Sequence, residues 1–228
     1  MVIVALDFSH PEQALALASQ ISPKECAVKV GFELFLTAGP ELVTSLVAQG
    51  HKVFLDLKFH DIPNTVAQAC LAAANMGVWM INIHAAGGTE MMQAARAAVD
   101  RAEQQPYLIA VTVLTSMDQA GLNAIGMQGD VPSIVSRWAH QAMQAGCDGV
   151  VSSAQEAQQI RQQTSDQFLL VTPGIRLPTD ASDDQKRIVT PQHAAQLGVD
   201  HIVVGRPITQ AQNPQQALQQ FTHAFASA

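Results

Sequence analysis

A hydrophobic run in the first third of the chain carries charged residues at the point where a buried strand should end. In LDLKFHDIPNT, residues 55–65, Asp56 and Lys58 are two positions apart and Asp61 follows three positions later. Residues i and i+2 of a strand share a face, so Asp56 and Lys58 would point into one site. Removing charges from water is costly unless opposite charges and hydrogen bonds compensate, so such clusters are seldom kept for stability alone. The spacing therefore indicates a catalytic cluster.

Two further charges end neighbouring apolar runs and could join this cluster. Asp7 closes the first run, residues 2–7, and Lys29 lies near the end of the second run, residues 26–31. For any single Asp–Lys pair, a solvated strand end or a structural ion pair is an equally good interpretation. The whole set of alternating charges fits a catalytic site better.

A phosphate site is indicated by VVGRPIT, residues 203–209. Gly205 has no side chain and permits close approach of the backbone, and the planar guanidinium of Arg206 suits a phosphate. In α/β barrels the loops after strands seven and eight frequently bind phosphate. Without that position in the fold, a turn glycine followed by a surface arginine would be the simpler interpretation.

Two other chemistries have weaker support. His60 and His84 follow neighbouring apolar runs and, with Asp56 or Asp61, could suggest a metal site. The sequence has no HxH or HExxH spacing, so we expect no metal. A serine hydrolase is also not indicated, because Ser152–Ser153 lacks the GxSxG pattern of a nucleophile elbow.

The elements that must position these residues follow from eight short apolar runs, whose lack of strict alternation predicts strands covered on both faces. The runs are Val2–Asp7, Cys26–Gly31, Lys52–Lys58, Met80–Ala85, Leu108–Thr115, Gly149–Ser153, Phe168–Ile175 and His201–Ile208. Segments with helical spacing alternate with them: Glu12–Ile21, Pro40–Gln49, Thr65–Met76, Glu90–Glu103, Ile134–Ala145, Ala154–Gln163, Pro191–Leu197 and Pro214–Phe225. This order predicts an α/β protein, a single (β/α)8 TIM barrel over residues 1–228. Chemistry in such a barrel lies at the carboxyl ends of the strands, where the charges occur.

The glycines and connections between these segments also fit a barrel. Glycines fall just after four helical segments, where C-terminal caps are expected: Gly50, Gly77, Gly146 and Gly198. Two polar connections are unusually long, residues 116–132 and residues 176–190. Long connections without regular structure in a compact domain are usually lids or binding loops.

Composition limits the possible partners and compartments. The net charge of −7 argues against a general nucleic-acid surface, so any anionic ligand must be held by local groups. We find no signal-peptide pattern and no apolar stretch long enough to span a membrane, so we expect a cytoplasmic protein that binds no membrane. Cys26, Cys70 and Cys147 follow no CxxC pattern, and we expect buried, reduced thiols.

With these positions in view, the chain resembles the bacterial orotidine 5′-phosphate decarboxylases from Val2 to about Phe225. The matching motifs are ALDF, VKVG, FLDLKFHDIPNT, NIHAAGG, VTVLTSM, VTPGIR and VVGRPIT, in the family's order. The DxKxxD core is shared by a wider suprafamily of sugar-phosphate decarboxylases and synthases, whereas the full set is more specific. The resemblance implies conversion of orotidine 5′-monophosphate to UMP and CO₂, the last step of de novo pyrimidine synthesis. It implies no metal and no organic cofactor.

The resemblance also implies roles for individual residues. The family's charge network corresponds to Lys29, Asp56, Lys58 and Asp61, with Lys58 stabilising a carbanion at C6 and then donating the proton that replaces the carboxylate. Substrate contacts would come from Asp7 and Lys29 at the ribose, Ile62, Thr115, Ser116 and Pro173 near the base, Gln185, Gly205 and Arg206 at the phosphate, and Arg176 at the start of the long loop. Asp61 and Thr65 would reach the neighbouring site of a homodimer.

Two alternatives to this activity stay open on the sequence. One is a Mg-dependent keto-gulonate-phosphate decarboxylase or hexulose-phosphate aldolase of the same suprafamily, which would need an extra carboxylate near Lys29. Glu33 follows Lys29 by four residues and could supply it. The other is a noncatalytic nucleotide-phosphate sensor, against which the intact DxKxxD set argues.

Overall fold

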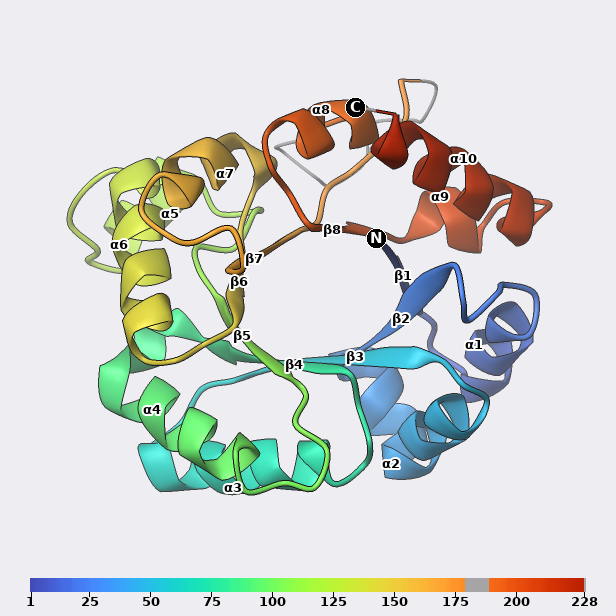
Figure 1. Ribbon diagram of the computed structural model, residues 1–228, viewed down its shortest axis with the longest axis horizontal. Helices are drawn as coiled ribbons and strands as arrows, with labels where there is room; N and C mark the ends of the chain where they lie inside the picture. The colour runs from blue at the N-terminus through green and yellow to red at the C-terminus, as the bar shows by residue number, and fades with distance from the viewer. Residues whose placement is uncertain (179–188, 228) are drawn as a thin grey trace.

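Parallel strands pair in chain order and close into a barrel, which Figure 1 shows end-on. This computed structural model describes residues 1–178 and 189–227 of the chain. Within them the barrel strands are β1 (Val2–Ala5), β2 (Cys26–Gly31), β3 (Lys52–Phe59), β4 (Met80–His84), β5 (Tyr107–Val111), β6 (Gly149–Val151), β7 (Leu169–Thr172) and β8 (His201–Val204). The predicted (β/α)8 barrel is confirmed.

Helices surround the strands as an outer ring (Figure 1). In the described residues they are α1 (Pro11–Ala18), α2 (Phe32–Ala48), α3 (Pro63–Ala74), α4 (Gly88–Val99), α5 (Gln119–Ala124), α6 (Val131–Gln144), α7 (Ala154–Arg161), α8 (Pro191–Gln196), α9 (Arg206–Thr209) and α10 (Pro214–Ala226). A short 3₁₀ helix, η1 (Ala85–Gly87), precedes α4. None of the helices in this described part has the length and apolar character needed to cross a membrane.

The side chains of the strands form two separate apolar layers. Inside the barrel, Ile3, Phe54, Met80 and Ile109 pack with smaller residues of the other strands. The larger core lies between the strands and the helices, where alternate strand residues such as Val28 are buried. Successive strand side chains point to opposite faces, and here both faces are apolar. This explains the uninterrupted apolar runs in the sequence.

The four predicted glycine caps are confirmed. Gly50, Gly77, Gly146 and Gly198 have φ values of 86°, 77°, 87° and 83°, in the left-handed region that favours glycine. After α2, the Gly50 and His51 amides donate to the Val47 and Leu46 carbonyls, which closes the helix before β3 begins. Each cap lies at the amino end of the barrel and turns the chain into the next strand.

Some elements differ from the sequence expectations. Helix α2 begins at Phe32, ahead of the expected start at Pro40, and it is kinked at Gly39, where φ is 69°. The connection at residues 116–132 contains α5, whose first turn is capped by the Asp118 carboxylate. Several strands end earlier than expected; β7 stops at Thr172 because the following Pro173 has no amide to continue a ladder.

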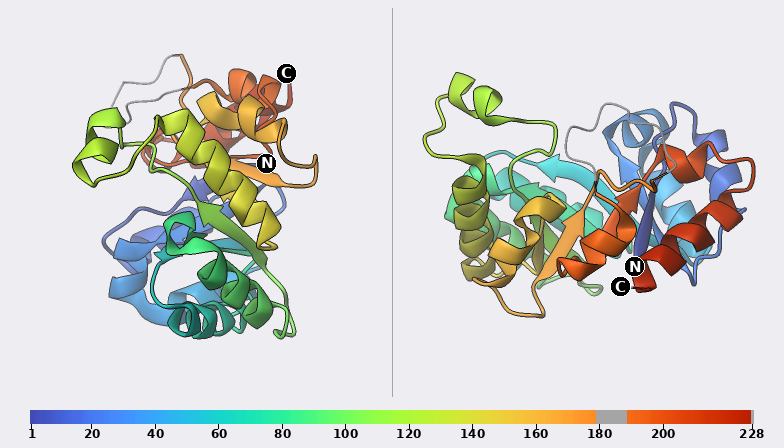
Figure 2. Two further views of the ribbon diagram at one scale, coloured as in Figure 1. Left: turned by 90° about the vertical axis from the view of Figure 1, so that its left-hand side faces the viewer. Right: turned by 90° about the horizontal axis from the view of Figure 1, so that it is seen from above.

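The two ends of the barrel are distinct. The right-hand view of Figure 2 shows α5 projecting beyond one end and both chain termini near the other. The strands run toward the end where α5 projects, so this is the carboxyl end, where chemistry is expected. The predicted buried thiols are confirmed: Cys26, Cys70 and Cys147 are free and buried, and burial raises the pKa of each to about 12.

Candidate active site

A layer of polar side chains lies next to the apolar interior of the barrel, on the side of its carboxyl end. Inner core residues Ala5, Ala27, Phe54, Met80 and Val203 are each followed, two positions later, by a residue on the same face of the strand or its extension. Those residues are Asp7, Lys29, Asp56, Asn82 and Gly205. Strand register therefore places four polar side chains, together with Gly205, at the carboxyl end of the barrel.

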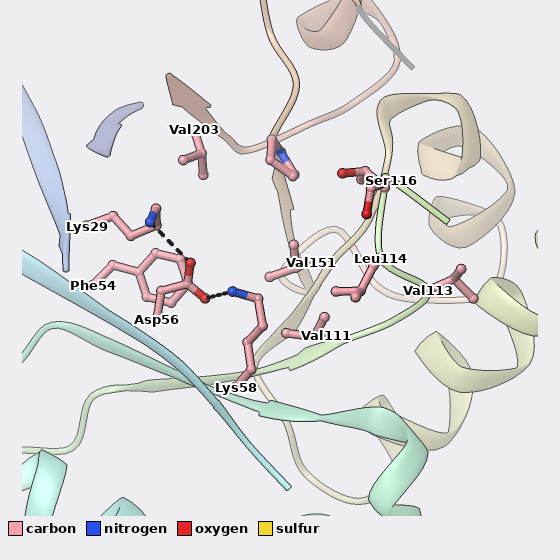
Figure 3. Close-up of a pocket in the computed structure, with 12 residues that line it drawn as sticks. Lys29, Phe54, Asp56, Lys58, Val111, Val113, Leu114, Ser116, Val151 and Val203 are labelled. Atoms are coloured by element: carbon pink, nitrogen blue, oxygen red, sulfur yellow. Dashed lines mark hydrogen bonds and ion pairs between the residues drawn. The ribbon is translucent and has the colours of Figure 1, made fainter. Parts of the chain in front are cut away.

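The charges in this layer form a connected network (Figure 3). Lys58 Nζ lies 2.7 Å from Asp56 Oδ1, and Lys29 Nζ lies 3.3 Å from Asp56 Oδ2. Lys29 Nζ also lies 3.0 Å from Asp7 Oδ1. The order of signs is Asp7, Lys29, Asp56, Lys58, so each of the two lysines is beside a carboxylate. This confirms the expectation that Asp56 and Lys58 share a face.

The local backbone that carries Lys58 is irregular. Parallel pairing between β3 and β4 shifts register between Leu55 and Phe59. Lys58 has a φ of 46° and is the one non-glycine residue with positive φ in residues 1–178 and 189–227. Its amide leaves the strand ladder and donates to the Asn82 side-chain oxygen at 2.8 Å. The irregularity is of the kind that re-aims a side chain next to an active site.

Burial and charge act in opposite directions on the two innermost groups. Burial by itself would lower the pKa of Lys29, but Asp56 and Asp7 outweigh it and raise that pKa above its ordinary value. Burial would likewise raise the pKa of Asp56, but Lys29, Lys58 and the Asn82 hydrogen bond outweigh it and lower that pKa. Both groups are therefore held in their charged forms.

Two adjoining cavities open above the network. The first, of about 200 Å³, is lined by Lys29, Phe54, Asp56, Lys58, Val111, Val113, Leu114, Thr115, Ser116, Val151, Pro173 and Val203. The second, of about 500 Å³, is lined by Ala5, Asp7, Phe8, Lys29, Pro173, Gly174, Arg176, Val203, Gly205, Arg206, Thr209 and Gln210. They share Lys29, Pro173 and Val203, so a single elongated ligand could occupy both. Their linings differ, since apolar side chains dominate around Lys58 and two arginines face the far end.

Most of the site residues named from the sequence line these cavities. Lys29, Asp56, Lys58, Thr115, Ser116 and Pro173 line the first, and Asp7, Arg176, Gly205 and Arg206 line the second. Arg176 is buried, and its Nη1 donates to the Ile175 carbonyl at 2.9 Å. Gln185 lies outside the described residues.

Three named residues do not line the cavities of their own chain. Asp61 and Ile62, in the turn between β3 and α3, and Thr65, in the first turn of α3, are exposed. The Asp61 carboxylate accepts the Ile62 amide at 2.6 Å, and no ion pair joins it to Lys58 in the described part of the chain. These three side chains are therefore not part of the lining of either cavity.

Two residues of β4 belong to the site but were not assigned a part in it from the sequence. Asn82 is fully buried and donates to Asp56 Oδ1 at 2.7 Å. The His84 ring stacks on His60 with centroids 5.3 Å apart, and burial, His60 and Lys58 lower the pKa of His84. The signal for Asn82 was available: a polar residue two positions after the inward-facing Met80.

The described residues do not group the side chains that a metal site would need. In the described residues, no group of three or more His, Cys, Asp or Glu side chains is placed to hold a metal ion. Glu33, the carboxylate that a Mg-dependent site would need beside Lys29, is exposed and accepts the Ser9 hydroxyl at 2.6 Å. The arrangement instead suits an anionic ligand whose reacting end meets Lys58.

Comparison with known proteins gives a consistent result. The family described as "Orotidine 5'-phosphate decarboxylase / HUMPS family" matches residues 1–221. Orotidine 5′-phosphate decarboxylase of Nitrosococcus oceani is 55% identical, over 95% of this chain and 94% of that protein. The protein of the same name from Legionella pneumophila strain Lens is 53% identical, over 93% of each chain.

Solved structures agree with the sequence relatives. The crystal structure of orotidine 5′-phosphate decarboxylase from Lactobacillus acidophilus is 39% identical, covers 98% of both chains and gives a TM-score of 0.87. The enzyme from Methanocaldococcus jannaschii, complexed with inhibitor BMP, gives a TM-score of 0.79 at 20% identity, a likeness that concerns the fold alone.

Proposed function

The chain belongs to the orotidine 5′-phosphate decarboxylase / HUMPS family, and from that premise we propose that it converts orotidine 5′-monophosphate to UMP and CO₂. This reaction is the last step of de novo pyrimidine synthesis and needs no metal or organic cofactor. The observation that carries the proposal is the Lys29–Asp56–Lys58 network at the floor of a largely apolar cavity.

The chemical problem is a localised carbanion. When the bond from C6 to the carboxylate breaks, CO₂ leaves and the electron pair stays on C6 in the ring plane, where the π system cannot delocalise it. A preorganised cation in a site with few polar neighbours stabilises such charge far better than water does. The Lys58 ammonium is this cation, and it then transfers one proton to C6 to complete UMP.

Asp56 has two tasks in this proposal. Its carboxylate, 2.7 Å from Lys58 Nζ, favours the charged form of Lys58 and fixes its direction. Lys29 holds the other carboxylate oxygen and links the network to Asp7. Asp7 and Lys29 line the second cavity, and in this proposal they bind the ribose hydroxyls.

The rest of the substrate extends from one cavity to the other. Thr115, Ser116 and Pro173 line the first cavity, which takes the pyrimidine. Gly205 and Arg206 line the second, which takes the phosphate, with Arg176 beside them. Gln185, outside the described residues, is proposed as a further phosphate ligand on the strength of the family resemblance alone. Binding energy from the distant phosphate can be used to lower the barrier at C6.

We propose that the working form is a homodimer in which Asp61 and Thr65 complete the partner's site. The start of α2 leaves two apolar side chains uncovered, Phe32, 51% exposed, and Leu36, 82% exposed. Phe32 adjoins the network, because Lys58 Nζ lies 5.5 Å from the centroid of its ring. An apolar surface next to a cavity is a common place for a subunit contact. Ile62, 67% exposed and next to Asp61 in the chain, would be buried with it.

A cytoplasmic location is part of the same proposal. The buried free cysteines suit a reducing compartment, where thiols are not oxidised.

The activity is tested by following the fall in absorbance of orotidine 5′-monophosphate with purified protein, in buffer containing EDTA. We expect turnover that EDTA does not change. Turnover that stops with EDTA and returns with Mg²⁺ would favour the metal-dependent members of the suprafamily. Binding without any turnover would favour a nucleotide sensor.

The shared site is tested by mixing inactive subunits. Lys58→Ala and Asp61→Ala chains are dissociated, mixed in equal amounts and reassociated. Random pairing makes half the dimers mixed, and one of the two sites in each is intact, so we expect about a quarter of the wild-type activity. The control mixes Lys58→Ala with Asp56→Ala, two residues of the same chain's site, and should recover nothing. Equal recovery in both mixtures, or none in the first, would contradict a shared site.

A further inference from the structure

The Asn82 side chain contacts the Lys58 backbone directly and reaches the Lys58 ammonium through Asp56. Its oxygen accepts the Lys58 backbone amide at 2.8 Å, and its nitrogen donates to Asp56 Oδ1 at 2.7 Å. Asp56 Oδ1 is the same atom that receives Lys58 Nζ at 2.7 Å. One buried amide group thus contacts both the backbone that carries Lys58 and the carboxylate that holds its ammonium.

The backbone contact has a clear structural reason. The Lys58 amide has left the β3–β4 ladder, because the pairing skips from Leu55 opposite Ile81 to Phe59 opposite Ile83. A buried amide without a partner is strongly disfavoured, and the left-handed backbone of Lys58 is disfavoured for any residue with a side chain. The Asn82 oxygen supplies the acceptor that the strand no longer offers. It thereby stabilises the conformation that points Lys58 into the cavity.

The hydrogen bond from Asn82 to the Asp56 carboxylate affects the ionisation of that carboxylate. Asp56 faces Lys29 from β2 and Lys58 from its own strand. Asp7 lies beyond Lys29, and His84 of β4 interacts with Lys58. The Asn82 amide is the neutral donor among its partners, and hydrogen bonding to a carboxylate favours the ionised form. It also holds Asp56 Oδ1 where Lys58 Nζ meets it.

We propose that Asn82 is a positioning residue for decarboxylation, which orients Lys58 through its backbone and through Asp56 without touching the substrate. The inference rests on the proposed function, because it gives Asn82 a part in the same reaction. Asn82 is fully buried and lies beneath the cavity floor, so removing its amide should weaken the chemical step and leave substrate affinity nearly unchanged.

A buried asparagine could instead serve stability alone, and a matched variant separates the two roles. Thr112, at the end of β5, is also fully buried, and its hydroxyl donates to the Val151 carbonyl at 2.8 Å. Thr112→Val removes one buried hydrogen bond outside the charge network. If Asn82 were only structural, Asn82→Leu and Thr112→Val would both lower thermal stability and both keep kcat per folded molecule.

The first experiment compares wild type, Asn82→Leu and Thr112→Val for turnover of orotidine 5′-monophosphate, with kcat expressed per molecule that binds UMP. Leu has nearly the shape of Asn and neither hydrogen bond. We expect kcat of Asn82→Leu to fall about 10- to 100-fold, the range for one lost bond to a charged group, with KM within about threefold of wild type. Thr112→Val should keep the wild-type kcat. Full kcat in Asn82→Leu with an active wild type would overturn the inference and leave the proposed function intact, whereas an inactive wild type would overturn the proposed function.

The second experiment uses Asn82→Asp, which keeps the acceptor for the Lys58 amide but replaces the donor to Asp56. Two adjacent carboxyl groups share a proton more readily as pH falls, and the protonated group can donate again. We therefore expect kcat of Asn82→Asp, relative to wild type at the same pH, to rise as pH is lowered, while the ratio for Asn82→Leu stays flat. A flat ratio for Asn82→Asp with wild-type kcat would overturn the inference. This variant also tests it if Asn82→Leu does not fold.

Discussion

At the amino end of the barrel, Arg161 pairs with Asp200 at 2.7 Å, and at the carboxyl end Lys58 pairs with Asp56 at the same distance. The distances are alike, but the surroundings are not. Arg161 also donates to the Phe168 and Gly198 carbonyls, at 2.7 and 2.8 Å. Lys58 faces a cavity instead.

The amino-end arrangement occurs twice. Asp200, just before β8, accepts the Leu170 amide of the neighbouring strand at 2.7 Å. Asp148, just before β6, pairs with Arg96 at 2.9 Å and accepts the Leu108 amide at 2.7 Å. In both cases a helix arginine and a carboxylate fix the start of two adjacent strands. Both ion pairs also hydrogen-bond to backbone groups, and they stabilise the fold.

The groups that surround an ion pair decide whether it stabilises the fold or acts on a ligand. In an ion pair surrounded by backbone donors and acceptors, the hydrogen-bonding groups are already occupied by the protein. The Lys58 ammonium keeps capacity directed at the cavity, where a ligand can use it. Matched substitutions at the two ends should therefore separate loss of activity from loss of stability.

The largest expected effect comes from Asp56→Asn at the carboxyl end. The change keeps the shape but leaves Lys29 and Lys58 without the carboxylate between them. We expect kcat to fall roughly 10³-fold or more, because the cation that stabilises the carbanion loses its orientation and its counter-charge. Steady-state kinetics on folded protein checks this. A loss below tenfold would mean that the pair is not central to the chemistry.

A smaller effect, on stability alone, is expected for Asp200→Asn at the amino end. Asn can still accept the Leu170 amide, but the charge opposite Arg161 is lost. We expect the free energy of unfolding to fall by about 1–2 kcal/mol, since the pair is partly buried, with Tm lower by roughly 3–6 °C. Thermal and urea unfolding measure the change. Because this pair lies far from the cavity, kcat should stay at the wild-type value, and a large fall in kcat would break the comparison.

The two ends should also respond differently to acid. Burial, with the nearby N-terminal amine, lowers the pKa of His201 from 6.5 to about 4. Between these pH values the unfolded chain takes up a proton that the folded chain does not, so stability falls as pH falls, by at most about 3 kcal/mol from this group. Urea unfolding of wild type and His201→Phe from pH 7 to pH 4 should show a shallower fall for the variant.

The carboxyl end should not follow the same curve. The pKa of Asp56 is lowered below its usual 3.8, so its stabilising interactions are present above that value and are lost only as pH falls through the lowered pKa. Over the range in which His201 weakens the fold, Asp56 stays ionised. Equal acid sensitivity of wild type and His201→Phe would contradict this division between the two ends.

The smallest expected effect is at a helix cap of the amino end. A Cβ at Gly50 would meet nothing within 4 Å, so Gly50→Ala tests only the φ of 86°. We expect a loss of about 1 kcal/mol in the free energy of unfolding, with unchanged kcat. A loss several times larger would show that the cap also fixes the register of β3, which follows it.

The fold could be predicted because its signals are local. Apolar runs marked the strands, and glycines such as Gly146 marked the helix ends that precede them. Helix α5 was missed because its six residues, Gln119–Ala124, are too few for a periodic pattern. The first part of α2 was missed because Gly39 and Pro40 suggested a break, whereas the chain there only kinks.

The site could be predicted in outline for a different reason. Charged residues at the ends of apolar runs are conspicuous, so Lys29, Asp56 and Lys58 were identified before their contacts were known. The backbone irregularity at Lys58 and the hydrogen bonds of Asn82 depend on the register between β3 and β4. That register is a tertiary property, which neither strand's sequence specifies alone.

The central claim is that Lys58 supplies the charge and the proton for decarboxylation. Its most direct test is kcat for orotidine 5′-monophosphate of wild type and Lys58→Ala, measured side by side in EDTA on folded protein. The account predicts rapid, metal-independent release of CO₂ with equal formation of UMP by the wild type, and no detectable turnover by Lys58→Ala. Turnover by Lys58→Ala at the wild-type rate would contradict it.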